Sequence, residues 1–296
     1  FQLDLAIQLA NTKELIDNAF QYEMFNSAGA WSTVEEVIVR PVLKTHQDNH
    51  RFSAVFLVNA QGVVISSTNL EMLGYDYSDQ DFIREAAAEK GAFSPVFYSD
   101  FTKQSTLAIA VPLYKSNEAN PMYVGTYVVF LNSEYLDHNL LQNLDSIGKS
   151  ADTYLINGDG VLITKPKYSE GLTVLETVVE AAGARELRAA IRAGDLAFQK
   201  NIITTDFHGK KSLVNIRCFS LGNQPVGLTV KIDYDDAFSV VNMMKIIILI
   251  LTLVITLAIA FIGAYFAGSL VKPLAIINNK VAEFSQGDLT VDFDII

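Results

Sequence analysis

Aromatic and polar side chains suited to a ligand pocket concentrate between residues 75 and 103 of the sequence. A small-molecule site needs walls that are mainly apolar or aromatic, and a few polar groups that fix the orientation of the ligand. With one residue of a later predicted strand, this stretch supplies both kinds: Tyr75, Tyr77, Phe82, Phe97, Tyr98 and Tyr127 as walls, and Gln80, Asp100 and Lys103 as polar groups. These residue types predict binding rather than catalysis.

Several of these residues have a structural explanation as well. Tyr127 and Phe130 alternate with their neighbours in a predicted strand, so one of the two must simply face the core. Phe82 stands beside Ile83 on a predicted helix, where core packing explains it as well as contact with a ligand does. Asp100 has the alternative role of stabilising a turn.

The histidines and the single cysteine offer little further chemistry. His46 and His50 are four residues apart, a spacing that could bind a metal on a helix. No cysteine or third histidine lies near them in the sequence, so a solvated helix end is the simpler interpretation. His138 and His208 are isolated and are interpreted as surface or hydrogen-bonded residues. Cys218 excludes an internal disulfide framework and is expected to be a small core residue.

Evidence for catalysis is absent from the sequence. It has no Gly-rich phosphate loop, no nucleophile elbow and no cluster of His, Cys and carboxylates, and Gly158-Asp159-Gly160 is typical of a hairpin turn. Residues 1–243 carry 19 Lys and Arg against 29 Asp and Glu, so nucleic acid is not an expected partner. The sequence therefore predicts a chain without enzymatic activity, cofactor or bound metal.

An internal repeat organises the first 240 residues. Phe56–Ser66 aligns without a gap on Tyr154–Thr164, with five of eleven positions identical, and each copy is typical of a strand, a tight turn that ends in glycine, and a second strand. Each copy closes with two more strands, at Leu107–Leu113 and Met122–Leu131, and at Leu213–Phe219 and Val226–Ile232. Helices are expected between them at Ser78–Lys90 and Val174–Ala193. Two copies of one α+β module follow from this pattern.

Helices are predicted ahead of the repeat. Apolar residues recur at mostly helical spacing over Gln2–Tyr22, which predicts a long amphipathic opening helix. Ser32 and Glu35 form a capping-box pattern, so we expect a second helix to begin near Trp31. Pro41 is expected to kink that helix.

The stretch Ile246–Val271 contains 26 residues without a charge and lies between Lys245 and Lys272. As a helix it would reach about 39 Å, which exceeds the roughly 30 Å hydrocarbon core of a bilayer. A buried core helix is the alternative, but core helices seldom stay uncharged for so long and usually keep a polar face. A membrane span is therefore predicted here.

The residues after the span have a pattern of their own. Lys272-Pro273 is expected to break the membrane helix, after which Leu274, Ile277, Val281 and Phe284 recur with the spacing of a short coiled-coil seam. A turn signal follows at Gly287-Asp288-Leu289. A proline at the membrane exit, one amphipathic helix and then Gly-Asp-Leu resembles the first half of a HAMP domain, the signal-converting linker of bacterial transmembrane receptors. The alternative is an amphipathic helix that lies on the membrane surface.

The order of these parts resembles a double Cache sensor followed by HAMP, as in bacterial methyl-accepting chemotaxis receptors. The segment 77–82 is similar to the entry of the family's pocket helix, and 235–238 is similar to its usual exit from the last strand. The resemblance covers essentially the whole chain and implies an α+β fold with a long N-terminal helix and two tandem PAS-like antiparallel-sheet modules. The implied boundaries are 1–50 for stalk helices, 51–132 for the membrane-distal module, 133–240 for the membrane-proximal module, 246–271 for the transmembrane helix and 272–296 for the start of HAMP.

Members of this family usually bind their ligands in the distal module. The resemblance therefore implies a pocket formed by Tyr75, Tyr77, Gln80, Phe82, Tyr98, Asp100, Tyr127 and Phe130. Amino-acid-sensing members carry an Arg where Gln80 stands here, and a carboxamide cannot hold a carboxylate through two charged hydrogen bonds as a guanidinium does. Ile83 replaces a second aromatic residue and Phe130 an ammonium-binding Asp, so we expect a less charged or more apolar ligand. Tyr75 and Gln80 are the leading candidates.

The resemblance implies that the chain senses a small molecule outside the membrane and signals across it. A methyl-accepting chemotaxis receptor that acts through a cytoplasmic kinase is expected, and the alternative is the sensor half of a histidine kinase or a diguanylate cyclase. A membrane-anchored binding protein that sends no signal is a third class, for which a HAMP start would have no use. The output type does not follow from any residue up to Ile296.

Orientation also rests on the resemblance, because the flanking lysines are too few to decide it. It puts residues 1–243 outside the cytoplasm and 272–296 inside. A homodimer along the opening helix is expected. The first residue is Phe rather than Met, and the resemblance implies a further membrane span upstream.

Overall fold

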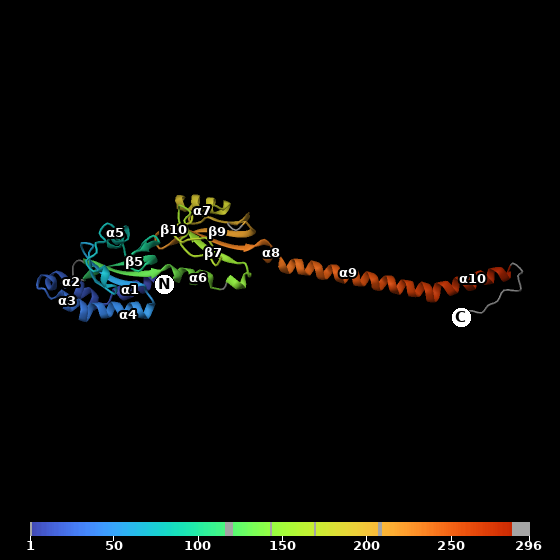
Figure 1. Cartoon of the computed structure of the whole chain (residues 1–296), viewed down its shortest axis with the longest axis horizontal. Helices are drawn as coiled ribbons and strands as arrows, with labels where there is room; N and C mark the ends of the chain where they lie inside the picture. The colour runs from blue at the N-terminus through green and yellow to red at the C-terminus, as the bar shows by residue number, and fades with distance from the viewer. Residues whose placement is uncertain (1, 116–120, 143, 169, 207–208, 286–296) are drawn as a thin grey trace. The chain divides into compact units, whose positions relative to one another are not determined.

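The computed structural model describes residues 2–115, 121–142, 144–168, 170–206 and 209–285 (Figure 1). The chain divides into two compact units, residues 1–236 and 237–296. The first contains the N-terminal helices and two antiparallel sheets, and the second is helical. The predicted α+β fold is confirmed.

The N-terminal region has four α-helical segments, and the last two belong to one helix that continues through a π-helical turn (Glu35–Val39). They are α1 (Gln2–Ala10), α2 (Lys13–Ser27), α3 (Trp31–Val34) and α4 (Arg40–His50). The predicted opening helix is interrupted at Thr12, whose backbone is extended and whose hydroxyl donates to the carbonyl of Leu9 at 2.7 Å. The predicted helix start at Trp31 is confirmed.

The prediction that Ser32 and Glu35 form a capping box is wrong. Ala30 is the N-cap of α3, and no side chain bonds to the free N–H groups there. Glu35 is instead buried, where its carboxylate accepts hydrogen bonds from Arg40 (2.9 Å, from Nε) and from the hydroxyl of Ser66 (2.8 Å). A carboxylate that is paired with a guanidinium and a hydroxyl tolerates burial, so the Glu at this position ties the helix to the sheet.

A π-helical turn accommodates each of two helical prolines. Glu35–Val39 is π-helical and Pro41 follows two residues later, and Ala267–Val271 is π-helical with Pro273 at the same spacing. Proline lacks an N–H and its ring meets the carbonyl four residues back in a regular helix. A wider turn relieves that contact, and the helix therefore continues through both prolines.

The first sheet has six antiparallel strands in the order β2-β1-β6-β5-β3, with β4 beside β5. They are β1 (Ala54–Asn59), β2 (Val64–Ser67), β3 (Ala92–Phe93), β4 (Phe97–Ser99), β5 (Gln104–Lys115) and β6 (Met122–Asn132). The N-terminal helices cover one face, and α5 (Asp81–Ala88) covers the other (Figure 1). Successive strand residues alternate between these two cores, as in β1, where Leu57 faces the N-terminal helices and Phe56 faces α5.

The second sheet has four antiparallel strands in the order β7-β10-β9-β8. They are β7 (Asp152–Ile156), β8 (Gln199–Thr205), β9 (Lys211–Leu221) and β10 (Gln224–Asp233), preceded by α6 (Ser133–Leu141) and a 3-10 turn (Leu144–Ser146). Helix α7 (Ala182–Ala193) packs on one face (Figure 1). A Cβ at Gly227 of β10 would lie 2.5 Å from the side chain of Leu187, so glycine allows this close packing.

The two predicted hairpin copies share one turn. In each, an Asn side-chain oxygen, of Asn59 or Asn157, accepts backbone N–H hydrogen bonds of 2.9–3.1 Å from the residues two and four positions later. Gly62 and Gly160 end the turns with φ of +94° and +83°, which glycine adopts without strain. The helices between the hairpins, α5 and α7, are shorter than predicted.

The C-terminal helices are α8 (Tyr234–Ala237), α9 (Ser239–Phe266) and α10 (Lys272–Ser285), with the π-helical turn between the last two. Ser239–Glu283 forms one candidate membrane span of 45 residues, with a mean hydropathy of 3.1 in its most apolar part. It is long and apolar enough to cross a bilayer. The predicted break at Pro273 is wrong, because the helix continues to Ser285. The Gly287-Asp288-Leu289 signal lies outside the described residues.

Candidate functional site

Four of the predicted site residues belong to one aromatic cluster at the α5 face of the first sheet. The Tyr77 ring centroid lies 4.8 Å from that of Tyr75, 6.2 Å from that of Phe82 and 6.5 Å from that of Phe130. Phe56 stands between two of them, stacked on Tyr77 at 5.4 Å and edge-on to Phe130 at 4.9 Å. The fold therefore brings these four residues together from a loop, a helix and a strand.

Most of this cluster is filled by its own rings. Tyr77, Phe82 and Phe130 are each at most 6% exposed, and burial raises the pKa of the Tyr77 hydroxyl. Tyr75 differs, because it is 48% exposed and its ring lies 5.0 Å from the ring of Phe101. Tyr75 therefore presents an exposed ring beside the buried ones.

The structure separates Tyr127 from this cluster. Tyr127 and Phe130 are three residues apart in β6, so they face opposite sides of the sheet. The Tyr127 hydroxyl lies 3.0 Å from Nδ1 of His46 on α4, and burial lowers the pKa of that histidine. The prediction that Tyr127 and Phe130 line one pocket is wrong. Tyr127 is a core residue beneath the N-terminal helices.

The two neighbouring histidines have other contacts than a metal. His46 is buried and engages Tyr127, while the ring of His50 packs 5.6 Å from that of Phe52. Across the part of the chain that the structure describes, no group of three or more His, Cys, Asp or Glu side chains is placed to hold a metal ion.

The remaining predicted residues are exposed. Gln80 is the N-cap of α5 without a side-chain bond to the helix, and Asp100 lies in the turn after β4. Tyr98 is 56% exposed, whereas its neighbour Phe97 turns inward and reaches Phe130 at 5.6 Å. Alternation along β4 therefore puts Phe97, and not Tyr98, in the aromatic cluster.

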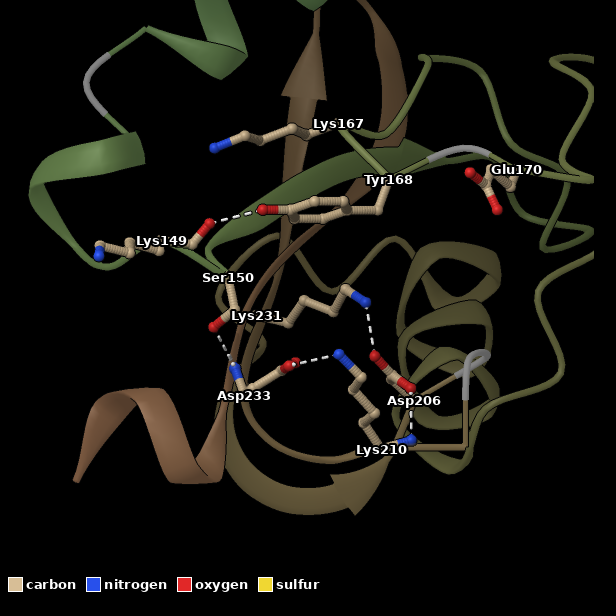
Figure 2. Close-up of a pocket in the computed structure, with 9 residues that line it drawn as sticks. All are labelled: Lys149, Ser150, Lys167, Tyr168, Glu170, Asp206, Lys210, Lys231 and Asp233. Carbon is tan, nitrogen blue, oxygen red and sulfur yellow. Dashed lines mark hydrogen bonds and ion pairs between the residues drawn. The ribbon is translucent and has the colours of Figure 1, made fainter. Parts of the chain in front are cut away.

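A cavity of about 590 Å³ opens in the second sheet (Figure 2). It is lined by residues of four separate segments: Lys149, Ser150, Lys167, Tyr168, Glu170, Asp206, Lys210, Lys231 and Asp233. The lining is strongly charged, with lysine and carboxylate side chains intermingled. Sequence reasoning missed this cavity.

An ion pair lies at the base of this cavity. Lys231 Nζ is 2.6 Å from Asp206 Oδ2, and both side chains are only 3% exposed. The other carboxylate oxygen of Asp206 accepts the backbone N–H of Lys210 at 2.9 Å. Removing two charges from water is costly, so these groups depend on each other for their burial.

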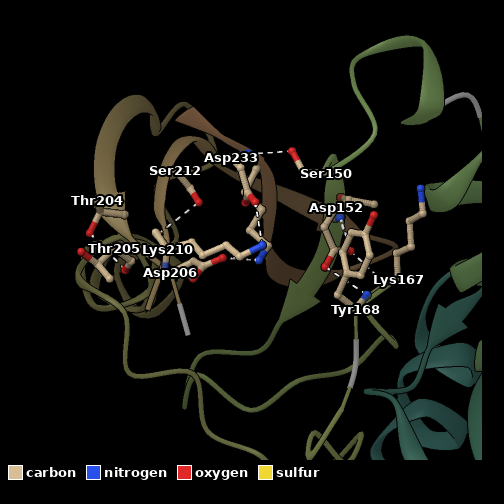
Figure 3. Close-up of polar contacts among 12 residues, drawn as sticks. Ser150, Asp152, Lys167, Tyr168, Thr204, Thr205, Asp206, Lys210, Ser212 and Asp233 are labelled. Carbon is tan, nitrogen blue, oxygen red and sulfur yellow. Dashed lines mark hydrogen bonds and ion pairs between the residues drawn. The ribbon is translucent and has the colours of Figure 1, made fainter. Parts of the chain in front are cut away.

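A second buried carboxylate lies across the sheet. The register of β10 and β7 places Lys231 opposite Asp152. The Oδ1 atom of Asp152 accepts the backbone N–H of Thr153 at 2.8 Å. It also accepts the backbone N–H of Lys167 at 2.7 Å (Figure 3). Burial raises the pKa of Asp152, and the Lys167 hydrogen bond and the Lys231 charge oppose that shift. The carboxylates of Asp206 and Asp152 thus both accept hydrogen bonds from groups of the protein itself.

The rim of the cavity is held by weaker contacts. Lys210 Nζ is 3.1 Å from Asp233 Oδ2 with the lysine side chain 66% exposed, and the pKa of Lys210 is raised by this hydrogen bond. The Tyr168 hydroxyl donates to the carbonyl of Lys149 at 2.5 Å. The Ser150 hydroxyl accepts the N–H of Asp233 at 3.0 Å.

One signal for this site exists in the sequence. Lys231 lies between Val230 and Ile232 near the end of β10, where a buried charge is unexpected. Its partner Asp206 is 25 residues away and lies beside a turn, so the pairing requires the register of the sheet.

No protein-family model and no curated protein matches the sequence. Among solved structures, the sensor domain of the Vibrio cholerae histidine kinase DctB is 14% identical with a TM-score of 0.50, over 76% of this chain and 86% of that one. The ligand-binding domain of the Pseudomonas fluorescens chemoreceptor CtaA, solved with L-isoleucine, is 20% identical with a TM-score of 0.50, over 81% of this chain and 87% of that one. Most of this chain therefore has a fold found in the sensor domain of a histidine kinase and in the ligand-binding domain of a chemoreceptor.

Proposed function

We propose that residues 1–243 form the extracytoplasmic sensor of a bacterial transmembrane receptor of the double Cache type. The main support for this proposal is that the second sheet leads almost directly into α9, a helix long enough to span a membrane. Strand β10 ends at Asp233, the one-turn helix α8 follows at once, and α9 begins at Ser239. Because no long linker separates β10 from α9, we expect a displacement of β10 to move the membrane helix. The fold shared with sensor domains supports the same proposal.

Residues 272–296 are proposed to lie in the cytoplasm as the start of a HAMP domain. The helix runs without interruption from the apolar segment into α10, which suits a segment that receives a movement from the span. The turn signal after α10 supports this assignment from the sequence alone.

The ligand site in the first half is proposed at the exposed rim of the aromatic cluster, in the module that the resemblance calls membrane-distal. Tyr75 offers an open ring above buried ones, and Gln80 offers an uncommitted carboxamide at the start of α5. No cationic side chain belongs to this set, so an uncharged or mainly apolar ligand is expected.

Replacing Tyr75 with alanine should weaken such a ligand about tenfold or more, because an aromatic wall contributes roughly 1.5 kcal/mol or more when it is covered. The measurement is the unfolding midpoint of the whole chain in detergent, titrated with compounds from a library of amino acids, organic acids, amines and purines. A compound that binds only the folded state raises the midpoint. Tyr135→Ala, which removes a comparably exposed tyrosine from α6, is the control. Equal weakening in both variants would contradict this site.

The proposed signal is a shift between two packings of the sensor, which a ligand can drive only if it binds one packing better. The route between the halves runs through the β9–β10 turn. Asn223 in this turn donates a hydrogen bond to Glu85 of α5, and Gly222 packs against Phe93 at the end of β3. A movement of α5 would therefore reach β10, and through it α9.

A homodimer along the opening helices is part of the proposal. Phe20 and Met24 of α2 are 44% and 59% exposed, which suits a surface that a second copy covers. The signalling partner would be a cytoplasmic kinase, as expected for a chemotaxis receptor.

The alternative output is a histidine kinase or a diguanylate cyclase carried by the receptor itself. Solved structures with this fold include the sensor domain of a histidine kinase, which keeps this class open. The chemotaxis proposal predicts that ligand changes the phosphorylation rate of a separate kinase. Autophosphorylation or cyclic dinucleotide synthesis by the receptor would instead favour the alternative.

A further inference from the structure

The cavity in the second sheet has the size of a small-molecule site. At about 590 Å³ it falls within the roughly 300–1,000 Å³ typical of such pockets. Its lining belongs to residues 149–233, whereas the aromatic cluster belongs to residues 56–130, so the two are separate candidates. The ring of Tyr168, 41% exposed, provides an apolar wall.

The charged groups of the cavity differ in how firmly they are held. Both aspartates are buried: Asp206 accepts hydrogen bonds from Lys231 and from the N–H of Lys210, and Asp152 accepts from the N–H groups of Lys167 and Thr153. These carboxylates therefore have little to offer a ligand cation. Their oxygens are used, and releasing them would leave buried charges uncompensated.

Lys210 is held loosely by comparison. Its ammonium pairs with Asp233 at 3.1 Å on a side chain that is 66% exposed. The Asp233 side chain is only 19% exposed, whereas Lys210 extends into solvent, so the lysine can turn to a new partner without burying its charge. Figure 2 shows the ammonium ends of Lys210 and Lys231 beside each other, between Asp206 and Asp233. Lys210 is thus a cation able to take a new partner, next to a second cation that is fixed in place.

We propose that this cavity binds a small organic carboxylate. The carboxylate of the ligand accepts charge-assisted hydrogen bonds from the Lys210 ammonium, and the nearby positive charge of Lys231 attracts it further. The organic part of the ligand packs on the ring of Tyr168. A carboxylate matches the charge of the two ammonium groups, whereas an uncharged ligand would gain no such attraction.

A ligand in the cavity would also change contacts near the start of the membrane helix. Asp233, the present partner of Lys210, is the last residue of β10. Its N–H donates to Ser150, whose own hydroxyl donates to Asp236 of α8 at 2.8 Å. A ligand that takes Lys210 from Asp233 changes the contacts at the point where the sheet meets the helix. This signalling role rests on the proposed function, while the binding itself does not.

The test uses the whole chain in detergent and measures the unfolding midpoint against acetate, lactate and succinate, each paired with its neutral amide at equal ionic strength. A bound carboxylate raises the midpoint and its amide does not. Lys210→Gln removes the charge from an exposed side chain and should weaken binding about tenfold or more. Lys200→Gln is the matched control, because Lys200 is also exposed and pairs with Glu186 outside the cavity.

Four outcomes would overturn the proposal. They are failure of every acid to raise the midpoint, equal shifts for the acids and their amides, equal binding by the Lys210 and Lys200 variants, and loss of carboxylate binding in Tyr75→Ala rather than in Lys210→Gln. The last result would place the carboxylate site beside Tyr75, on the first sheet, and would leave the sensor proposal intact. Failure of every acid, with another compound binding at Tyr75, would likewise reject only the second site.

Discussion

Gly222→Ala should destabilise the chain by about 2–4 kcal/mol and uncouple the two halves of the sensor. Gly222 has a φ of +65°, which costs a non-glycine residue roughly 1 kcal/mol or more. A Cβ there would also overlap the ring of Phe93, and overpacking of this kind adds about 1–3 kcal/mol. The turn must then move away from the first sheet, and the contact that carries the proposed signal is lost.

Gly194→Ala provides the matched control for this prediction. Gly194 has a φ of +66° at the end of α7, and a Cβ there would meet nothing within 4 Å. The two variants therefore share the same backbone cost, and their difference in denaturant unfolding isolates the contact with Phe93. Phe93→Leu in the Gly222→Ala background should recover part of that difference. Equal destabilisation by the two alanine variants would show that the turn does not depend on this packing.

Lys231→Met should cost about 3–5 kcal/mol, since it leaves the buried carboxylate of Asp206 without its counter-charge. The double variant Lys231→Met with Asp206→Asn should recover most of the loss, because the amide oxygen can still accept the N–H of Lys210. Lys200→Met, which breaks an exposed pair, should cost less than about 1 kcal/mol.

Denaturant unfolding followed by circular dichroism measures these three variants and Asp206→Asn alone. If Lys231→Met unfolds at nearly the same denaturant concentration as the Lys200 variant, the pair does not stabilise the base of the cavity. If Asp206→Asn alone proves as damaging as Lys231→Met, and the double variant is no better than either, the two residues act through other partners.

Local chemistry explains what could be predicted from the sequence. The turns at Asn59 and Asn157 follow from an Asn that bonds its own backbone and a glycine that accepts positive φ. The long apolar segment is likewise evident from composition. Both features depend on residues within one stretch of chain.

Features set by long-range pairing could not be predicted. Strand parity separates Tyr127 from Phe130, and only the observed register shows which of them joins Tyr77. Strand β8 was missed because Gln199–Thr205 is mostly polar and exposed at the edge of its sheet. The cavity in the second sheet gathers residues from 149 to 233, and apart from Lys231 each has the character of an ordinary surface residue when taken alone.

Tertiary context also overrode two local rules. Glu35 fits a capping box in sequence, yet its carboxylate meets Arg40 and Ser66 in the core. Pro273 fits a helix break, yet a π-helical turn carries the helix through it. In the second case a continuous helix transmits a movement from the span to the following residues better than a broken one would.

The central claim is that a ligand bound outside the membrane changes the output inside it. The most direct measurement joins residues 1–285 to the cytoplasmic part of a chemoreceptor of known output and follows the activity of its kinase, using each compound that raises the unfolding midpoint. We expect saturation with such a compound to change kinase activity, and Gly222→Ala to abolish the response to a compound bound at Tyr75 without abolishing its binding. Identical kinase activity in ligand-saturated and ligand-free receptors would show that ligand binding outside the membrane does not change the output inside it.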